Sequence, residues 1–361
     1  MTFKRPFVAL AAVAAIASLC LAGCTSVGYY WQSVSGHMRL INAARPVDEW
    51  LADAQTPEPL KARLAMTQRI RSFAVSDLKL PDNASYHRYA DLRRSAVVWN
   101  VVAAPELSLT LITWCFPVVG CVGYRGYFNE LEARAEAAQL KAQGLEVSVY
   151  GVPAYSTLGW FNDPLLSTFI DYPDAELARL MFHELAHQLL YVAGDAPFNE
   201  AFATAVEEAG MQRWVALHDD AVSGAIYVRN AARRQDFVAL LDQHRKALAI
   251  IYAHDMPDQR KREQKTRIFG VLRDDYRVLK HDWGGYAGYD RWFAAPLSNA
   301  HLASIATYHE LLPAFRALLA QHKNLPDFYA AVRVLARRSQ PERDLFFSNS
   351  PGRGRAVPGD S

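Results

Sequence analysis

The sequence predicts a mainly helical protein of the α+β type with one small β-sheet. Most of the 361 residues lie in long segments where apolar side chains recur every three or four positions, as on one face of a helix. Only two segments, 96–104 ("AVVWNVVAA") and 145–152 ("LEVSVYGV"), have the β-branched or alternating character of strands. The chain is 51% hydrophobic and 21% charged, which suits a globular protein with a substantial core.

Capping residues and prolines set the expected limits of the helices. Residues 129–144 are bounded by Asn129, a favourable N-cap, and by Gly144, a common C-terminal stop. The segment 109–128 is expected to be irregular or a hairpin. Further helices are expected within 25–80, from Asp174 to about Ala193 with Gly194 as its stop, from a cap at Asn199 to about His218, over 227–254 and 257–280, and over 299–338 with breaks near Pro313 and Pro326.

The first 23 residues have the pattern of an export signal. Lys4 and Arg5 precede an apolar run from Val8 to Leu21, which is too short for a membrane span. The run ends in "LAGC" at 21–24, which resembles the bacterial lipoprotein box. The resemblance implies removal of 1–23 and lipid attachment at Cys24. An ordinary secretory signal with an unrelated cysteine is the alternative.

The lipoprotein box implies a place in the bacterial cell envelope, with the protein anchored to a membrane through Cys24. Thr25, rather than Asp, follows the cysteine, which favours the outer membrane and a body that faces the periplasm. The net charge of +2 gives no electrostatic reason to expect a nucleic-acid partner. Residues 24–347 are expected to form a single unit, and the Gly-, Pro-, Arg- and Ser-rich tail 348–361 to be disordered.

Two further cysteines, Cys115 and Cys121, remain in the mature chain. An even pair in an oxidising compartment favours a disulfide. Pro117 and Gly120 lie between them and suit a tight reversal. Two buried free thiols are the alternative.

The segment "LMFHELAHQLL", 180–190, contains the pattern His-Glu-x-x-His. Residues four apart share one face of a helix, so His183 and His187 can bind one metal ion, and Glu184 beside them can take a proton from a water molecule. The flanking residues are apolar, and histidines on a buried helix are costly unless they are satisfied. A catalytic zinc ion also needs a third protein ligand.

The third ligand is indicated by "FNEAFAT", residues 198–204. This segment resembles the Asn-Glu-x-Phe-Ala element of the gluzincin metallopeptidases, including the M1 aminopeptidases, in which the glutamate is a zinc ligand. The resemblance implies Glu200 as the third ligand and Zn²⁺ as the cofactor, although only 12 residues separate His187 from Glu200 here. Glu207, two turns further on, is the alternative ligand or an acceptor for a histidine N–H; Asp195 is a weaker candidate.

Nearly the whole mature chain is similar to a family of bacterial lipoproteins classed as putative aminopeptidases. That resemblance implies a zincin-like catalytic unit that hydrolyses a peptide substrate, with Glu184 as general base. It also implies a tyrosine that stabilises the oxyanion. Tyr286 and Tyr289 lie in the glycine-rich segment "HDWGGYAGYDRWF", where the backbone can approach a ligand closely, and we choose Tyr289.

The sequence indicates the type of peptidase less clearly than it indicates the metal site. The Gly-x-Met-Glu-Asn loop with which M1 enzymes recognise a free amino group is missing, and "AYSTLGWFNDP" occupies its place. Asp163 in that segment could contribute a charge. The alternatives are a metal-dependent endopeptidase, a cell-wall amidase, and a non-catalytic envelope lipoprotein with a structural metal site.

Overall fold

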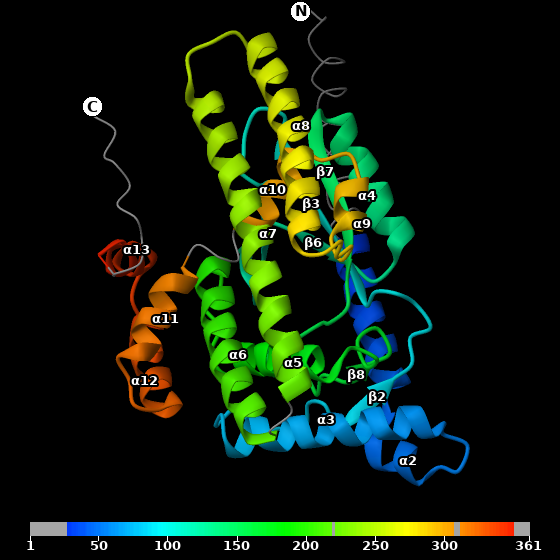
Figure 1. The fold of residues 1–361 in the computed structure, drawn as a ribbon. Coiled ribbons are helices and arrows are strands. Elements are labelled where there is room, and N and C mark those ends of the chain that lie inside the picture. Colours follow the sequence, from blue (N-terminus) through cyan, green and yellow to red (C-terminus); the bar gives the residue numbers. More distant parts are fainter. Residues whose placement is uncertain (1–26, 219–220, 307–310, 350–361) are drawn as a thin grey trace, which may run out of the picture.

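A computed structural model of the protein describes residues 27–218, 221–306 and 311–349. Long helices surround small sheets of two or three strands, which confirms the predicted mainly α fold with a small β-sheet (Figure 1). The export signal, Cys24 and the tail beyond Asn349 lie outside the described residues. Within the described part of the chain, no helix is both long enough and apolar enough to cross a membrane.

The helices follow the predicted segments closely. Residues 27–43 are helical. The later helices are α2 (Val47–Ala52), α3 (Glu58–Ser76), α4 (Glu130–Ala142), α5 (Asp174–Leu189), α6 (Ala196–His218), α7 (Ala221–Ala253), α8 (Asp258–Asp282), α9 (Asp290–Ala294), α10 (Asn299–Ala306), α11 (Leu312–Ala320), α12 (Leu325–Ala336) and α13 (Gln340–Ser348).

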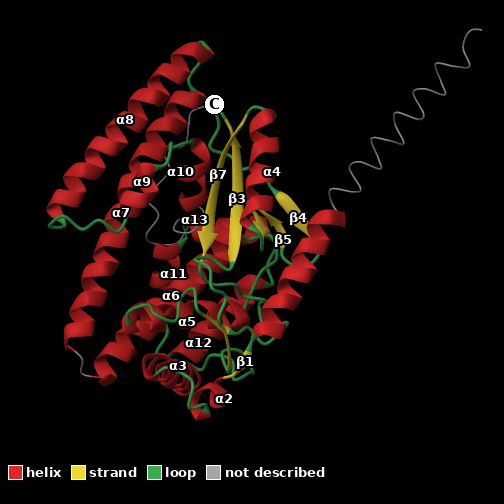
Figure 2. Ribbon diagram, turned by 90° about the vertical axis from the view of Figure 1, so that its right-hand side faces the viewer, coloured by secondary structure: helices red, strands yellow, loops and turns green. Residues whose placement is uncertain are grey.

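The main sheet has the order β6-β3-β7, with both pairs antiparallel. Its long strands are those that the sequence predicts, β3 (Val98–Pro105) and β7 (Leu145–Val152), with β6 (Arg125–Tyr127) at one edge. Helix α4 packs on one face of this sheet (Figure 2). A second sheet contains β1 (Arg45–Pro46), β2 (Arg88–Ala90) and β8 (Leu165–Leu166).

Helices α5 and α6 occupy the centre of the larger hydrophobic core. They pack against each other, with α3 against α5 and α11 against α6. The side chains of Phe182, Phe198 and Phe202 are fully buried between these layers. Helices α7 and α8 form a long pair with a smaller apolar cluster of its own, which includes Phe237 and Leu272 (Figure 1).

The predicted helix limits on the two sides of the α5–α6 connection are wrong. Helix α5 ends at Leu189 rather than near Ala193, because Leu190 is already extended. Helix α6 begins at Ala196, and the carboxylate of Asp195, not Asn199, accepts from the N–H of Phe198 in the capping position.

Asn199 has a different structural role inside α6. Its amide pairs with both the N–H and the carbonyl of Val192, at 2.7 and 2.8 Å, and so holds the α5–α6 connection against the helix. The predicted breaks near Pro313 and Pro326 are confirmed. Helices α11 and α12 begin at Leu312 and Leu325, and each proline lies in a first turn, where it needs no N–H partner.

The predicted disulfide is present. Strands β4 (Trp114–Phe116) and β5 (Gly120–Val122) form an antiparallel hairpin, and Cys115 and Cys121 are bonded across it. The hairpin turn lies against the α5–α6 connection, where the carbonyl of Val119 accepts from the N–H of Gly194. Gly120 has φ +76°, and a Cβ on it would lie 2.4 Å from the Gly194 nitrogen. The hairpin therefore supports the loop between the two central helices.

We expect loss of this disulfide to lower the stability of the protein moderately. Closure of so short a loop stabilises the folded state by about 2 kcal/mol in the chain-entropy account. The double variant Cys115→Ser/Cys121→Ser should therefore unfold at a lower temperature than the wild type. Thermal unfolding followed by circular dichroism, with and without a reductant, measures the effect. Equal melting temperatures in all four samples would contradict it.

Candidate metal centre

Three predicted ligands converge at the contact between α5 and α6. His183 and His187 lie one turn apart on α5, and Glu200 projects from the second turn of α6. The two Nε2 atoms are 3.2 Å apart, and the Glu200 carboxylate lies 3.3 Å from that of His183 and 3.6 Å from that of His187. Their ligand atoms all lie within 4.8 Å of one another. Residues that a single ion would bind are thus brought together.

The chemistry of this group fits a catalytic zinc ion. Two imidazole nitrogens and one carboxylate oxygen are a known donor set for such sites. Burial lowers the pKa of His187 to about 4, which keeps its imidazole neutral and able to bind a metal. No fourth ligand joins the three among the described residues. A structural zinc site would be closed by a fourth protein ligand, so the open set favours a catalytic site.

Glu207 supports His183 from the side away from the other ligands. Its carboxylate lies 3.0 Å from Nδ1 of His183, which leaves Nε2 of that ring toward Glu200. Of the two roles open to Glu207, the structure favours the acceptor for a histidine N–H. Such carboxylates fix the tautomer and the ring orientation of a metal-binding histidine.

Arg179 holds Glu207 in turn. It contacts both carboxylate oxygens of Glu207, at 3.1 and 3.2 Å, and pairs with Glu176, which also binds Arg234 of α7. Burial would raise the pKa of the Glu207 carboxyl, but Arg179 and His183 outweigh it and lower that pKa to about 2. Glu207 is therefore ionised when it accepts from His183.

We expect Glu207→Gln to weaken metal binding while leaving the three ligands in place. The amide keeps the size of the side chain but loses the charge that fixes His183, and loss of such a partner reduces metal affinity by about 10- to 100-fold. Competition with a chelator of known affinity measures the change. Glu208→Gln is the matched control, because Glu208 is the next residue on α6 and pairs instead with Arg316. Equal affinities in the two variants would contradict a supporting role.

The carboxyl group of Glu184 has a pKa suited to proton transfer near neutral pH. Burial raises the pKa of its carboxyl to about 7, the largest effect on this group. Among the described residues, its carboxylate forms no hydrogen bond or ion pair. A carboxyl group with this pKa near neutral pH can both accept and return a proton.

Two tyrosines other than the predicted Tyr289 interact with groups of the site. The ring of Tyr191 is 6.5 Å from that of His187, and burial together with Glu200 raises the pKa of its hydroxyl. Burial raises the pKa of Tyr124, with Tyr191, Glu200 and Glu184 adding to the shift. The charges of Glu200, the proposed third ligand, and of Glu184, the predicted base, therefore both affect the pKa of the Tyr124 hydroxyl.

Tyr289 lies in the smaller core. Its ring stacks on Phe237 at 3.9 Å, and Tyr286 lies beside it with its ring under Arg233. The charged residues that affect the pKa of Tyr289 include Arg234 and Glu176, at the other end of the Arg179 network from His183. Its role in stabilising an oxyanion stays a prediction.

Two other acidic candidates have structural partners. The buried carboxylate of Asp163 accepts from the Thr157 hydroxyl at 2.7 Å and from Gln188 of α5, and so fixes the loop that precedes the metal helix. Asp195 forms a buried ion pair with Arg343 of α13 at 2.7 Å. Neither belongs to the three-residue group that could bind a metal.

Sequence reasoning missed Arg179 and Tyr124. Arg179 lies one turn before His183, so its helical spacing could have placed it on the ligand face. No local signal identifies Tyr124, because it lies in the segment that follows the disulfide hairpin, far from the ligands in the sequence.

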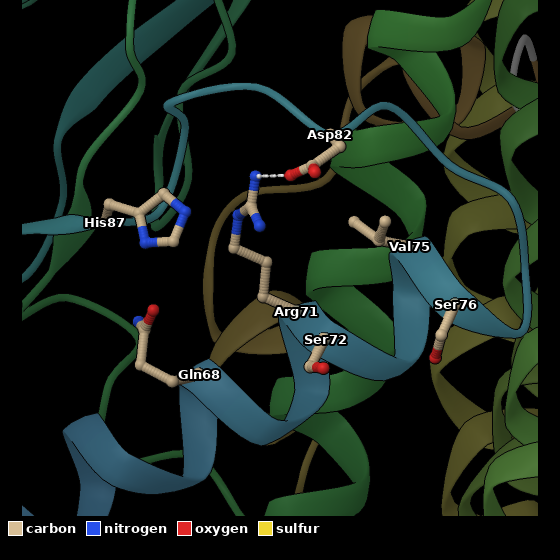
Figure 3. Close-up of a pocket in the computed structure, with 7 residues that line it drawn as sticks. All are labelled: Gln68, Arg71, Ser72, Val75, Ser76, Asp82 and His87. Carbon is tan, nitrogen blue, oxygen red and sulfur yellow. Dashed lines mark hydrogen bonds and ion pairs between the residues drawn. The ribbon is translucent and has the colours of Figure 1, made fainter.

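A surface hollow beside α3 does not contain any of the three candidate metal ligands (Figure 3). Arg71 reaches from α3 toward Asp82, at 3.1 Å, and also donates to the carbonyl of Ser85. These bonds hold the loop that leads to β2. The hollow is lined by Gln68, Arg71, Ser72, Val75, Ser76, Asp82 and His87. Its charged groups are thus committed to structural contacts.

No curated protein and no solved structure matches the chain. One family model does match, over residues 28–347, and its description is "putative aminopeptidase". The match includes the metal ligands, Glu184 and both core clusters. The chain therefore belongs to this family, whose description supports a peptidase function.

Proposed function

We propose that the protein is a zinc-dependent peptidase, and specifically an aminopeptidase, that acts through His183, His187, Glu200 and Glu184. The convergence of the three ligand atoms, next to Glu184 on the same helix, carries this proposal. Membership of the aminopeptidase family supports the choice of a peptide as substrate.

His183, His187 and Glu200 would hold the ion, and Glu207 would keep His183 in the tautomer whose Nε2 faces it. A bound zinc ion supplies Lewis acidity toward a peptide carbonyl and lowers the pKa of water. Glu184 takes the proton from the attacking water and passes it to the nitrogen of the leaving amine. With its pKa raised to about 7, Glu184 can serve in both directions of this transfer near neutral pH.

We expect Tyr124→Phe to reduce kcat more than Tyr289→Phe does. Glu184 and Glu200 both raise the pKa of the Tyr124 hydroxyl, whereas the Tyr289 ring stacks on Phe237. Loss of one donor to a developing oxyanion costs about 10²- to 10³-fold in kcat. Steady-state kinetics of the two variants decide between them, and a larger loss in Tyr289→Phe would restore the sequence-based choice.

The direct test compares substrates with free and blocked amino ends. The purified protein, with its metal content measured, is given aminoacyl reporters and the same reporters acetylated at nitrogen. We expect hydrolysis of the free form only. Equal cleavage of both would indicate an endopeptidase or an amidase, and bound zinc without any cleavage would indicate a structural site.

We also propose that the protein is tethered to the bacterial outer membrane through lipid at Cys24 and faces the periplasm. The sequence "LAGC" at 21–24 and the following Thr25 support this location. Incorporation of labelled palmitate into the wild type, but not into Cys24→Ser, is the expected result. Labelling of both proteins would contradict lipidation at this cysteine.

A further inference from the structure

The first described helix, residues 27–43, exposes an apolar face to solvent. Its large exposed apolar side chains are those of Val27, Tyr30, Trp31, Val34 and Met38. The spacing of three, four, seven and eleven residues from Val27 places all five on one stripe of the helix. Trp31 is 73% exposed. A surface helix of a soluble protein normally presents its polar side to water, so an exposed apolar stripe of this length is unusual.

One polar residue of the same helix, Gln32, faces the protein and binds the sheet edge. Gln32 is buried, and its side chain accepts from the N–H of Phe128 and donates to the carbonyl of Gly126, next to and within the edge strand β6. His37, at the edge of the apolar stripe, is also buried. These contacts fix the rotation of the helix about its axis. The apolar stripe therefore cannot turn inward without breaking the bonds of Gln32 to the sheet edge.

Two residues of another segment extend the stripe. The ring of Phe161 lies 4.5 Å from that of His37, and Phe161 and its neighbour Trp160 are both exposed, Trp160 by 71%. Their loop is held by Thr157, which bonds to Phe161 through its hydroxyl and to the buried Asp163. The stripe and this pair together form what we call the apolar face: Val27, Tyr30, Trp31, Val34, Met38, Trp160 and Phe161.

We propose that the apolar face lies on the surface of a lipid bilayer. Residues 6–38 contain no Asp, Glu, Lys or Arg, so the helix enters the fold without a charge on its exposed stripe. Tyrosine and tryptophan with neighbouring aliphatic side chains are typical of the membrane–water interface.

The position of Cys24 points to the same partner. It precedes Val27 by three residues, which span at most about 11 Å when extended. A lipid at Cys24 would hold this end of the helix beside the bilayer. In Figure 1 the helix, drawn in dark blue, lies on the other side of α5 and α6 from α11–α13. The proposal therefore predicts that α11–α13 stay away from the membrane surface.

Fluorescence quenching by brominated lipid tests the proposal on the full chain. The protein is reconstituted into vesicles of phosphatidylethanolamine and phosphatidylglycerol, with plain or brominated acyl chains. Because the chain has eight tryptophans, the contribution of the face is obtained by difference from Trp31→Phe/Trp160→Phe. We expect that double variant to lose about half of the quenching or more, since Trp31 and Trp160 are the two tryptophans among the large exposed apolar side chains of the described residues.

A second pair of variants separates contact of the face from simple tethering. Val34→Glu/Phe161→Glu leaves Cys24 intact but places two charges on the face, and it should reduce the quenching by about half or more. Val228→Glu/Val334→Glu changes two equally exposed valines on α7 and α12 and should leave it unchanged. Unchanged quenching in the first variant would overturn the proposal. Loss of quenching together with disulfide-linked pairs of Val34→Cys chains in the vesicles would instead assign the face to a second copy, and would also overturn it.

Peptidase activity on a soluble reporter provides an independent readout. Val34 lies outside the metal centre and outside the segment that precedes the metal helix, so the single variant Val34→Glu should hydrolyse the reporter at the wild-type rate. Failure of the membrane proposal would therefore leave the proposed function untouched, and the reverse also holds.

Discussion

Replacement of Glu184 by Gln is expected to lower kcat/KM by about 10³-fold, within the range that general acid–base groups contribute. The amide has the same size and leaves His183 and His187 in place, but it cannot accept a proton from water. Since the carboxylate of Glu184 pairs with no described residue, its loss disrupts no existing ion pair. The measurement is steady-state hydrolysis of the preferred aminoacyl reporter, with bound zinc determined on the same sample.

The interpretation depends on the metal content of the variant. A Glu184→Gln protein that keeps its zinc but not its activity assigns Glu184 to proton transfer. Glu208→Gln makes the same chemical change on α6, away from the ligands, and should retain full activity. Wild-type activity in Glu184→Gln would contradict the proposed mechanism. Loss of both zinc and activity would mean that Glu184 acts on the metal site itself.

The convergence of the candidate ligands was predictable because the pattern that carries two of them is local. His183, Glu184 and His187 lie within five residues of one helix, and helical spacing alone places both histidines on the same face. Glu200 required the second pattern, "NEAFAT", and a short connection that returns the chain beside α5. That connection, residues 190–195, begins and ends about four residues earlier than predicted, and Asn199 and Asp195 bind backbone groups around it.

The surroundings of the site were not predictable in the same way. Tyr124 and Arg343 approach from segments far away in the sequence, so no window of residues around them shows their neighbours. The exposed apolar stripe of the first helix is a similar case. Its stripe of apolar residues has the period of a helix that packs inward, and only the bonds of Gln32 to Phe128 and Gly126 reveal that the stripe faces outward. Periodicity identifies an apolar face but does not say what covers it.

Replacement of Glu200 by Ala is expected to abolish both zinc binding and peptidase activity. With one of three ligands removed, His183 and His187 remain as a two-nitrogen site on one helix, which does not complete a catalytic zinc site. We expect the variant to contain no zinc after dialysis at a metal concentration that saturates the wild type. Activity should fall by at least about 10³-fold, to the level of the chelator-treated wild type. Added zinc should restore the activity of the chelator-treated wild type but not that of Glu200→Ala.

Comparison with Glu207→Ala separates a ligand from its support. Both glutamates lie near His183, but Glu200 approaches Nε2 and Glu207 approaches Nδ1. Removal of Glu207 leaves Arg179 with one carboxylate fewer in a buried setting, so that variant should lose stability as well as zinc affinity. Glu200 has no arginine partner among the described residues, so its removal should cost zinc with little loss of stability in the metal-free state. If Glu200→Ala keeps its zinc while Glu207→Ala loses it, the two roles are exchanged, and the ligand set must be drawn with Glu207 instead.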